Sequence, residues 1–109
     1  MKLQDLAQKL ELKLVTAAFD KEVGGVYISD MVSDVIASAK AGDLLVTVQI
    51  HSNVIAAANL LDLCGIVVTQ GKLPGDDVVK IAEKVEIPIY STELNRWQMA
   101  TRLYEAGIR

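Results

Sequence analysis

Residue types on which many functional sites depend are scarce in this sequence of 109 residues. Cys64 is the only cysteine and His51 the only histidine, so the chain forms no internal disulfide and has no Cys/His cluster with the spacing of a zinc site. No P-loop phosphate-binding motif is present, and Gly24 and Gly25 are not followed by the rest of a dinucleotide-binding fingerprint. Nucleotide hydrolysis and phosphoryl transfer by this chain alone are therefore not expected.

Positive charge is also sparse. The 11 Lys and Arg residues are scattered, and 14 Asp and Glu residues give the chain a net charge of −3 at pH 7. This balance disfavours nucleic acid and anionic membranes as partners, because both bind basic surfaces. No apolar stretch reaches the roughly 20 residues of a membrane span, and the segment Met1–Asp5 is too polar for a signal peptide. We expect a cytoplasmic protein with no nucleic-acid and no membrane partner.

Aliphatic residues, by contrast, are abundant and are arranged in short runs that stop at small polar residues. These runs predict buried strands over Val26–Ile28, Leu44–Ile50, Gly65–Thr69 and Ile89–Tyr90, and Leu12–Thr16 alternates like a strand exposed on one side. The run Leu44–Ile50 is the longest and is expected to be the most central. A helical pattern follows each buried run, so the sequence predicts a single three-layer α/β domain over residues 1–109 with a mainly parallel central sheet.

The helical patterns can be assigned from their apolar faces and their caps. Leu3, Leu6, Ala7 and Leu10 share one face of an opening helix, and Ser29 or Asp30 can cap a helix that buries Val32, Val35, Ile36 and Ala39. Asp76 and Asp77 place negative charge at the start of a later helix, where it is stabilising. The last helix is expected to bury Leu94, Trp97, Ala100 and Tyr104.

The helix predicted over Val54–Leu63 has few polar residues, chiefly Asn59 and Asp62. A helix that is apolar nearly all round is buried on more than one side. Either it packs against a second subunit, in which case the protein is a homodimer, or it is enclosed in its own domain between the sheet and the terminal helix. We predict the homodimer, with this helix as its interface.

Polar residues follow each predicted parallel strand. Because the carboxyl ends of parallel strands meet at one edge, these residues should form a polar rim that suits binding better than bond breaking. The predicted ligand-binding residues are Ser29, Asp30, His51, Ser52, Asn53, Thr69, Gln70, Ser91 and Thr92. The sequence predicts no catalytic residues, no metal site and no cofactor.

Several of these residues have a structural interpretation as well as a functional one. His51 is either a general base, phosphate contact or phospho-acceptor, or a loop residue that orders the turn through hydrogen bonds to the backbone. Ser52 and Asn53 either cap the following helix or contribute to an anion site at its N-terminus. Cys64 is interpreted as a small apolar core residue and not as a nucleophile.

Six segments together resemble the DRTGG domain family. They are Lys2–Leu6, Asp20–Gly25, Val26–Asp30, Gly42–Thr47, Gly65–Gly71 and Ile87–Leu94, and they span nearly the whole chain. The chain has no contiguous DRTGG string, and Lys21 follows Asp20 where the family usually has an arginine. The same pattern is similar to the N-terminal domain of HPr kinase/phosphorylase, so the resemblance implies that fold.

The resemblance also implies a kind of function. The catalytic P-loop of HPr kinase/phosphorylase lies in a separate C-terminal domain, so kinase activity does not carry over to this chain. Family members accompany other modules, such as paired CBS domains in regulated pyrophosphatases. The resemblance therefore implies a non-catalytic regulatory or ligand-sensing module that binds a nucleotide or small metabolite, such as a phosphorylated one, and assembles with a partner enzyme. The alternative is a small enzyme or phospho-carrier that uses His51.

Overall fold

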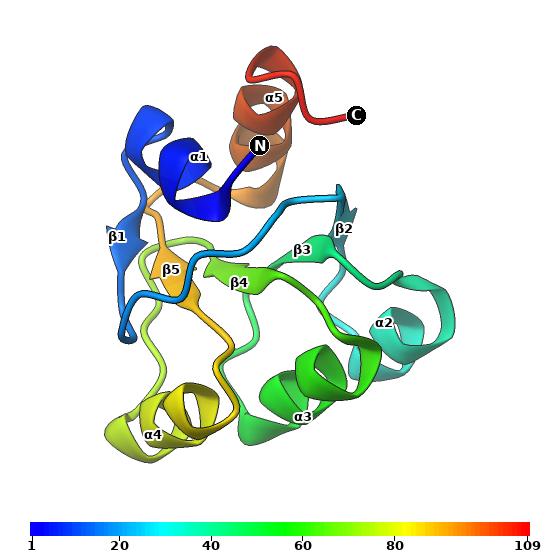
Figure 1. The fold of residues 1–109 in the computed structure, drawn as a ribbon, viewed down its shortest axis with the longest axis vertical. Helices are drawn as coiled ribbons and strands as arrows, with labels where there is room; N and C mark the ends of the chain where they lie inside the picture. Colours follow the sequence, from blue (N-terminus) through cyan, green and yellow to red (C-terminus); the bar gives the residue numbers. More distant parts are fainter.

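All 109 residues are described by the computed structural model, in which five strands form one sheet. The strands are β1 (Lys13–Leu14), β2 (Gly25–Ile28), β3 (Asp43–Thr47), β4 (Gly65–Val68) and β5 (Ile89–Ser91). They follow the order β1-β5-β4-β3-β2, and only β1 runs antiparallel to its neighbour (Figure 1). The mainly parallel sheet predicted from the sequence is confirmed.

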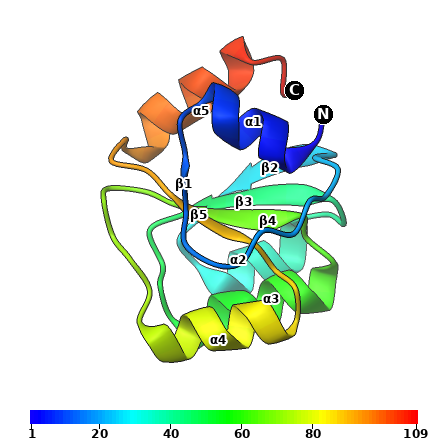
Figure 2. The ribbon, with the colours of Figure 1, turned by 60° about the vertical axis from the view of Figure 1, so that its left-hand side comes forward.

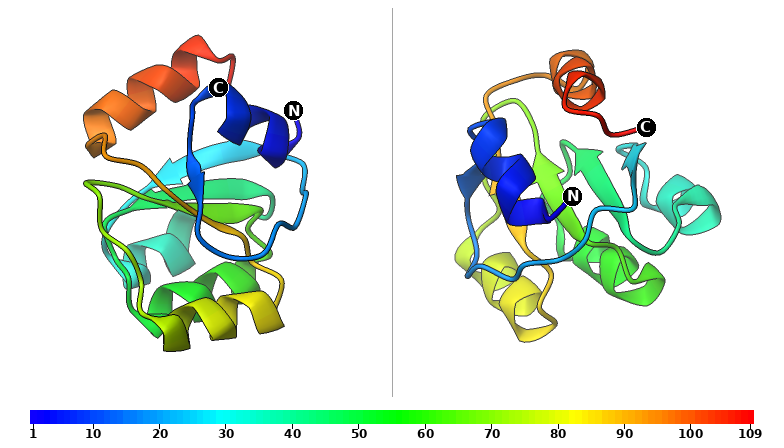
Figure 3. Two further views of the ribbon diagram at one scale, coloured as in Figure 1. Left: turned by 90° about the vertical axis from the view of Figure 1, so that its left-hand side faces the viewer. Right: turned by 45° about the horizontal axis from the view of Figure 1, so that its top comes forward.

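Five helices cover the two faces of this sheet. They are α1 (Leu3–Lys9), α2 (Val32–Ser38), α3 (Ser52–Leu61), α4 (Asp76–Lys84) and α5 (Arg96–Glu105). Helices α1 and α5 lie on one face and the other three on the opposite face, which is the predicted three-layer α/β arrangement (Figure 2). Figure 3 shows that both chain termini lie on the side of α1 and α5. None of the helices has the length and apolarity needed to cross a membrane.

Side chains of each strand alternate between two cores, one under each helical layer. Leu45 and Ile66 pack toward α2, α3 and α4, whereas Leu44 and Val67 pack toward α1 and α5. All four residues of β4 are buried, because this strand lies at the centre of the sheet and is covered on both faces.

Three strand predictions need correction. β3 is the longest strand, but it ends at Thr47 and lies beside the central strand β4. The prediction that Val26–Ile28 is buried is wrong, because β2 is an edge strand with Ile28 exposed. The segment Leu12–Thr16 forms only the two-residue strand β1 at the other edge. Apolar content alone does not show which strand has a neighbour on only one side.

The helix after β2 starts differently from the prediction. Met31 is the N-cap residue of α2 and no side chain caps this helix. Ser29 instead accepts a hydrogen bond from the Met31 N–H at 3.2 Å, and so orders the turn before the helix. Val35 faces the core as predicted, but Ile36 is exposed.

Helix α3 buries most of its apolar residues within its own domain. Val54, Ile55, Ala57 and Ala58 are buried. The helix packs between α2 and α4. The alternative to the dimer placed it between the sheet and the terminal helix, but α5 lies on the opposite face of the sheet (Figure 1). Its outer surface still exposes Leu60, at 71%.

Helix α5 buries a different face from the one predicted. Asn95 and Gln98 form a capping box that fixes the start of the helix. From this start, Met99 and Leu103 face the sheet and are fully buried. Trp97 and Tyr104 were expected in the core but lie on the outer side, 79% and 62% exposed. The helix carries two apolar stripes, and the aliphatic one faces the core.

Candidate functional site

The structure places the predicted binding residues along the carboxyl edge of the parallel strands. Ser29 and Asp30 follow β2, His51, Ser52 and Asn53 follow β3, Thr69 and Gln70 follow β4, and Ser91 and Thr92 are at the end of β5. Their side chains have different environments, so the edge divides into a part held by internal hydrogen bonds and a part that is open.

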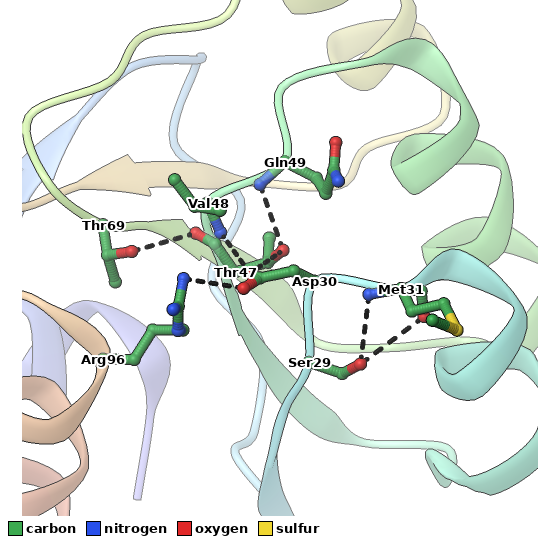
Figure 4. A network of polar contacts seen from close by, with 8 residues as sticks. All are labelled: Ser29, Asp30, Met31, Thr47, Val48, Gln49, Thr69 and Arg96. Atoms are coloured by element: carbon green, nitrogen blue, oxygen red, sulfur yellow. Dashed lines mark hydrogen bonds and ion pairs between the residues drawn. The ribbon is translucent and has the colours of Figure 1, made fainter.

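Asp30 is the centre of the first part (Figure 4). Its Oδ1 accepts a hydrogen bond from the Val48 N–H at 2.8 Å and another from the Thr47 hydroxyl at 3.2 Å. Its Oδ2 forms an ion pair of 2.6 Å with Arg96, the first residue of α5. One carboxylate therefore joins the β2–α2 loop, the end of β3 and the start of α5. The Thr69 hydroxyl donates to the Thr47 carbonyl at 3.4 Å. These groups stabilise the edge and have partners within the protein.

His51 is the N-cap residue of α3. Its Nδ1 accepts a hydrogen bond from the Asn53 N–H at 3.1 Å, and the side chain is exposed. The histidine, and not Ser52 or Asn53 as predicted, therefore satisfies a free amide of the first helical turn. This is the loop-ordering role that was the structural interpretation of His51, and it leaves Nε2 facing solvent.

The loops after β4 and β5 are joined by backbone hydrogen bonds. The Gln70 N–H donates to the Leu94 carbonyl and the Gly71 N–H donates to the Thr92 carbonyl, each at 2.9 Å. Gln70 and Gly71 both have a left-handed backbone, with φ of 62° and 68°. A Cβ on Gly71 would lie 2.5 Å from a carboxylate oxygen of Glu93, so the glycine makes room for this carboxylate. The two loops form one hydrogen-bonded unit.

Beside this unit lies a hollow of about 380 Å³, the open part of the edge. Ser91 and Thr92 are the only predicted site residues that line it. The rest of the lining comes from the end of α1, β1, the β4–α4 and β5–α5 loops and α5: Leu10, Glu11, Lys13, Gly71, Leu73, Glu93, Leu94 and Arg102. A second hollow of about 200 Å³ shares Leu94 and Arg102 and continues along α5 past Trp97.

Several of these lining residues carry no signal in the sequence that would mark them as part of a site. Lys13 reaches the carboxyl end of β5 because β1 is antiparallel and pairs Lys13 with Ser91. Arg102 reaches it from the second turn of α5. Arg96, which holds Asp30, follows the capping Asn95, but nothing in its position indicated its partner. Such neighbours depend on strand order and helix placement, which are not encoded in local patterns.

Cys64, Tyr90 and the acidic residues are the other side chains that could take part in catalysis or bind a metal ion. Burial raises the pKa of the Cys64 thiol to about 12, so this cysteine carries no thiolate near neutral pH. Burial, followed by the charge of Asp20, also raises the pKa of Tyr90. No group of three or more His, Cys, Asp or Glu side chains is placed to hold a metal ion.

A family model described as the DRTGG domain matches residues 5–106. The chain belongs to the DRTGG domain family. This match confirms the family resemblance found in the sequence. The matched residues include all five strands of the sheet and every residue that lines the hollow. A search among curated proteins finds no match for the chain.

A solved structure supports the DRTGG fold. It is the crystal structure of the CBS and DRTGG domains of the regulatory region of Clostridium perfringens pyrophosphatase, complexed with the activator diadenosine tetraphosphate. The TM-score is 0.72 at 15% identity, over 93% of this chain. This DRTGG chain spans 45% of the length of that chain. The two proteins share the fold of this domain.

Proposed function

We propose that this DRTGG chain is a non-catalytic regulatory module that binds a small molecule in the hollow at the carboxyl end of β5. The observation that carries the proposal is the hollow itself, whose size is at the lower end of small-molecule sites and whose floor is held by the two joined loops. The related pyrophosphatase region is regulatory and was crystallised with a nucleotide activator. A nucleotide or a small metabolite, such as a phosphorylated one, is therefore the first ligand class to test.

Binding and turnover can be separated in one experiment. Isothermal titration with adenine nucleotides, common phosphorylated metabolites and amino acids should give saturable binding to at least one ligand, which is recovered unchanged after long incubation. Replacement of Gly71 by Ala, which displaces Glu93, should weaken that binding, whereas Gly107→Ala, whose added Cβ would have no neighbour within 4 Å, should not. Conversion of the ligand to product by the purified chain would contradict a non-catalytic module.

A regulatory module needs an enzyme to regulate. The DRTGG domain of the similar structure belongs to the regulatory region of a pyrophosphatase, so we infer that this chain also assembles with a partner enzyme, in the cytoplasm. The test is a measured rate: addition of the chain and its ligand should change the activity of a co-purifying enzyme. An enzyme that binds the chain without any change in rate would count against regulation.

The protein is also proposed to form a homodimer, but through α5 and not through α3. Helix α3 exposes a single large apolar side chain, Leu60, whereas α5 exposes both Trp97 and Tyr104. These two aromatic residues are seven positions apart and so lie on one side of the helix. In an antiparallel pair of α5 helices related by a two-fold axis, Trp97 of each copy would meet Tyr104 of the other, with the small residues Ala100 and Thr101 between them.

The available area is consistent with such a pair. An aromatic side chain buries about 150–250 Å² when it is covered, so at their present exposures Trp97 and Tyr104 would bury roughly 400–700 Å² over two copies. Stable interfaces bury about 1,200–2,000 Å² in total, so the aromatic stripe would supply about a third. In light scattering, Trp97→Asp should give a monomer and Leu60→Asp should leave the dimer intact. A dimer that is lost only in Leu60→Asp would restore α3 as the interface, and a monomeric wild-type protein at high micromolar concentration would reject the dimer.

The rival function is a phospho-carrier or small enzyme that uses His51, because the Nε2 of this exposed histidine faces solvent. It predicts that the chain incorporates phosphate and that His51→Gln abolishes the incorporation. Under the regulatory proposal, His51→Gln alters helix capping but leaves ligand binding unchanged.

A further inference from the structure

The hollow at the end of β5 contains four charged side chains from four parts of the fold. Glu11 follows α1, Lys13 is in β1, Glu93 is in the β5–α5 loop and Arg102 is in α5. The two ion pairs of the chain join other residues, Met1 with Glu22 and Asp30 with Arg96. Two cations and two carboxylates thus line the hollow without pairing with one another, and they remain available to a ligand.

The balance of these charges selects a class of ligand. A polyanion placed beside Lys13 and Arg102 would also lie beside the carboxylates of Glu11 and Glu93, and like charges repel. A single anion and a single cation carried by the same molecule can each meet an opposite charge. A zwitterion therefore fits the hollow better than a nucleotide polyphosphate does.

The uncharged residues that line the hollow indicate the chemistry of the uncharged part of the ligand. Three leucines, Leu10, Leu73 and Leu94, are its apolar residues, and Leu73 is 53% exposed. The hydroxyl groups of Ser91 and Thr92 lie among them. A short apolar chain attached to the charged groups would cover leucine surface that is now in water.

The Glu93 carboxylate has room in the hollow because residue 71 is a glycine. It lies against Gly71, where any side chain would collide with it, and Gly71 is itself fixed by the hydrogen bond of its N–H to the Thr92 carbonyl. The missing side chain at Gly71 thus leaves space for an anionic group at the hollow, where it can meet the ammonium group of a ligand.

We propose that this hollow binds a small zwitterion with an apolar body, of the chemical class of the apolar α-amino acids. The carboxylate of the ligand would meet Arg102 and Lys13, its ammonium group would meet Glu93 and Glu11, and its side chain would cover Leu73 and Leu94. This inference rests on the proposed function, since it names the ligand class of the same regulatory site.

The test is a titration of the full chain with L-leucine and with two analogues that each lack one charge. Isoamylamine has lost the carboxylate and isocaproate has lost the ammonium group. L-leucine should bind saturably at millimolar concentration or below, and each analogue should bind roughly 10- to 100-fold more weakly, because one charge-assisted contact is lost. Equal binding of L-leucine and either analogue would overturn the proposal.

Variants locate the site and separate the two proposals. Glu93→Gln and Arg102→Gln should each weaken L-leucine binding by a similar factor, whereas Glu105→Gln and Lys80→Gln, which change the same charges outside the hollow, should not. If AMP binds and Arg102→Gln abolishes that binding while L-leucine, L-methionine and L-phenylalanine do not bind, the zwitterion proposal fails and the regulatory site survives. If neither AMP nor any of the three amino acids binds, both proposals fail.

Discussion

Removal of the Asp30 carboxylate should destabilise the protein strongly, although the residue lies at the edge of the sheet. Its Oδ1 accepts from the Val48 N–H at 2.8 Å and its Oδ2 pairs with Arg96 at 2.6 Å. A hydrogen bond to a charged acceptor contributes about 1.5–3 kcal/mol, and an exposed ion pair at most about 1 kcal/mol. In Asp30→Ala the free energy of unfolding should therefore fall by about 2–4 kcal/mol.

Urea denaturation followed by circular dichroism measures this loss, with an unchanged m-value as the sign that the unfolded state is the same. The matched variant is Asp30→Asn, which keeps an oxygen acceptor for the Val48 N–H but loses the charge of that acceptor and the ion pair with Arg96. It should cost about 1–2 kcal/mol, less than Asp30→Ala. If Asp30→Ala were within about 0.5 kcal/mol of the wild type, or if Asn were as costly as Ala, the carboxylate would not join the loops as described.

Three further predictions use single positions. Gly71→Ala should lower the free energy of unfolding by about 1–2 kcal/mol, because Gly71 has a left-handed backbone. Gly107 also has a left-handed backbone, but only the Cβ added at Gly71 would meet Glu93, so Gly71→Ala should cost more than Gly107→Ala in thermal denaturation. The Cys64 thiol has a pKa of about 12 when folded and 9.0 ordinarily, so the unfolded chain loses its proton first and stability should fall between these pH values. Between these pH values the free energy of unfolding should fall by up to about 1.4 kcal/mol per pH unit because of this thiol. In urea melts, Cys64→Ala should remove this contribution to the pH dependence, and an unchanged pH dependence in the variant would refute the burial argument. His51→Ala should cost about 1 kcal/mol by the same assay and His51→Asn only a few tenths, since asparagine also caps helices; an equal cost would show that the imidazole acts otherwise.

The layered fold could be predicted from the sequence because each parallel strand carries its own signal. A continuous apolar run such as Ile66–Val68 is typical of a strand covered on both faces, and the helical patterns between the runs require parallel pairing. The order of strands could not be predicted in the same way. Val26–Ile28 is as apolar as a central strand but lies at an edge, where Ile28 is exposed.

The site could be predicted only as an edge of the sheet. Asp30 and Thr69 follow their strands as expected, but the fold uses their polar atoms to join loops. The groups that line the hollow with Ser91, such as Lys13 and Arg102, come from an antiparallel strand and from the middle of a helix. Their convergence depends on the whole topology. Helix α5 likewise has two apolar stripes, one with Trp97 and Tyr104 and one with Met99 and Leu103, and the pattern alone does not show which of them faces the core.

The most direct test of the regulatory site is a map of amide chemical shifts in the isotope-labelled chain, titrated with pooled nucleotides, phosphorylated metabolites and amino acids. The proposed site predicts that at least one pool shifts the amides around the hollow, namely Glu11–Lys13, Gly71 and Ser91–Leu94, in a saturable manner. Shifts confined to the opposite edge of the sheet, or no shifts with any pool at millimolar concentration, would contradict it.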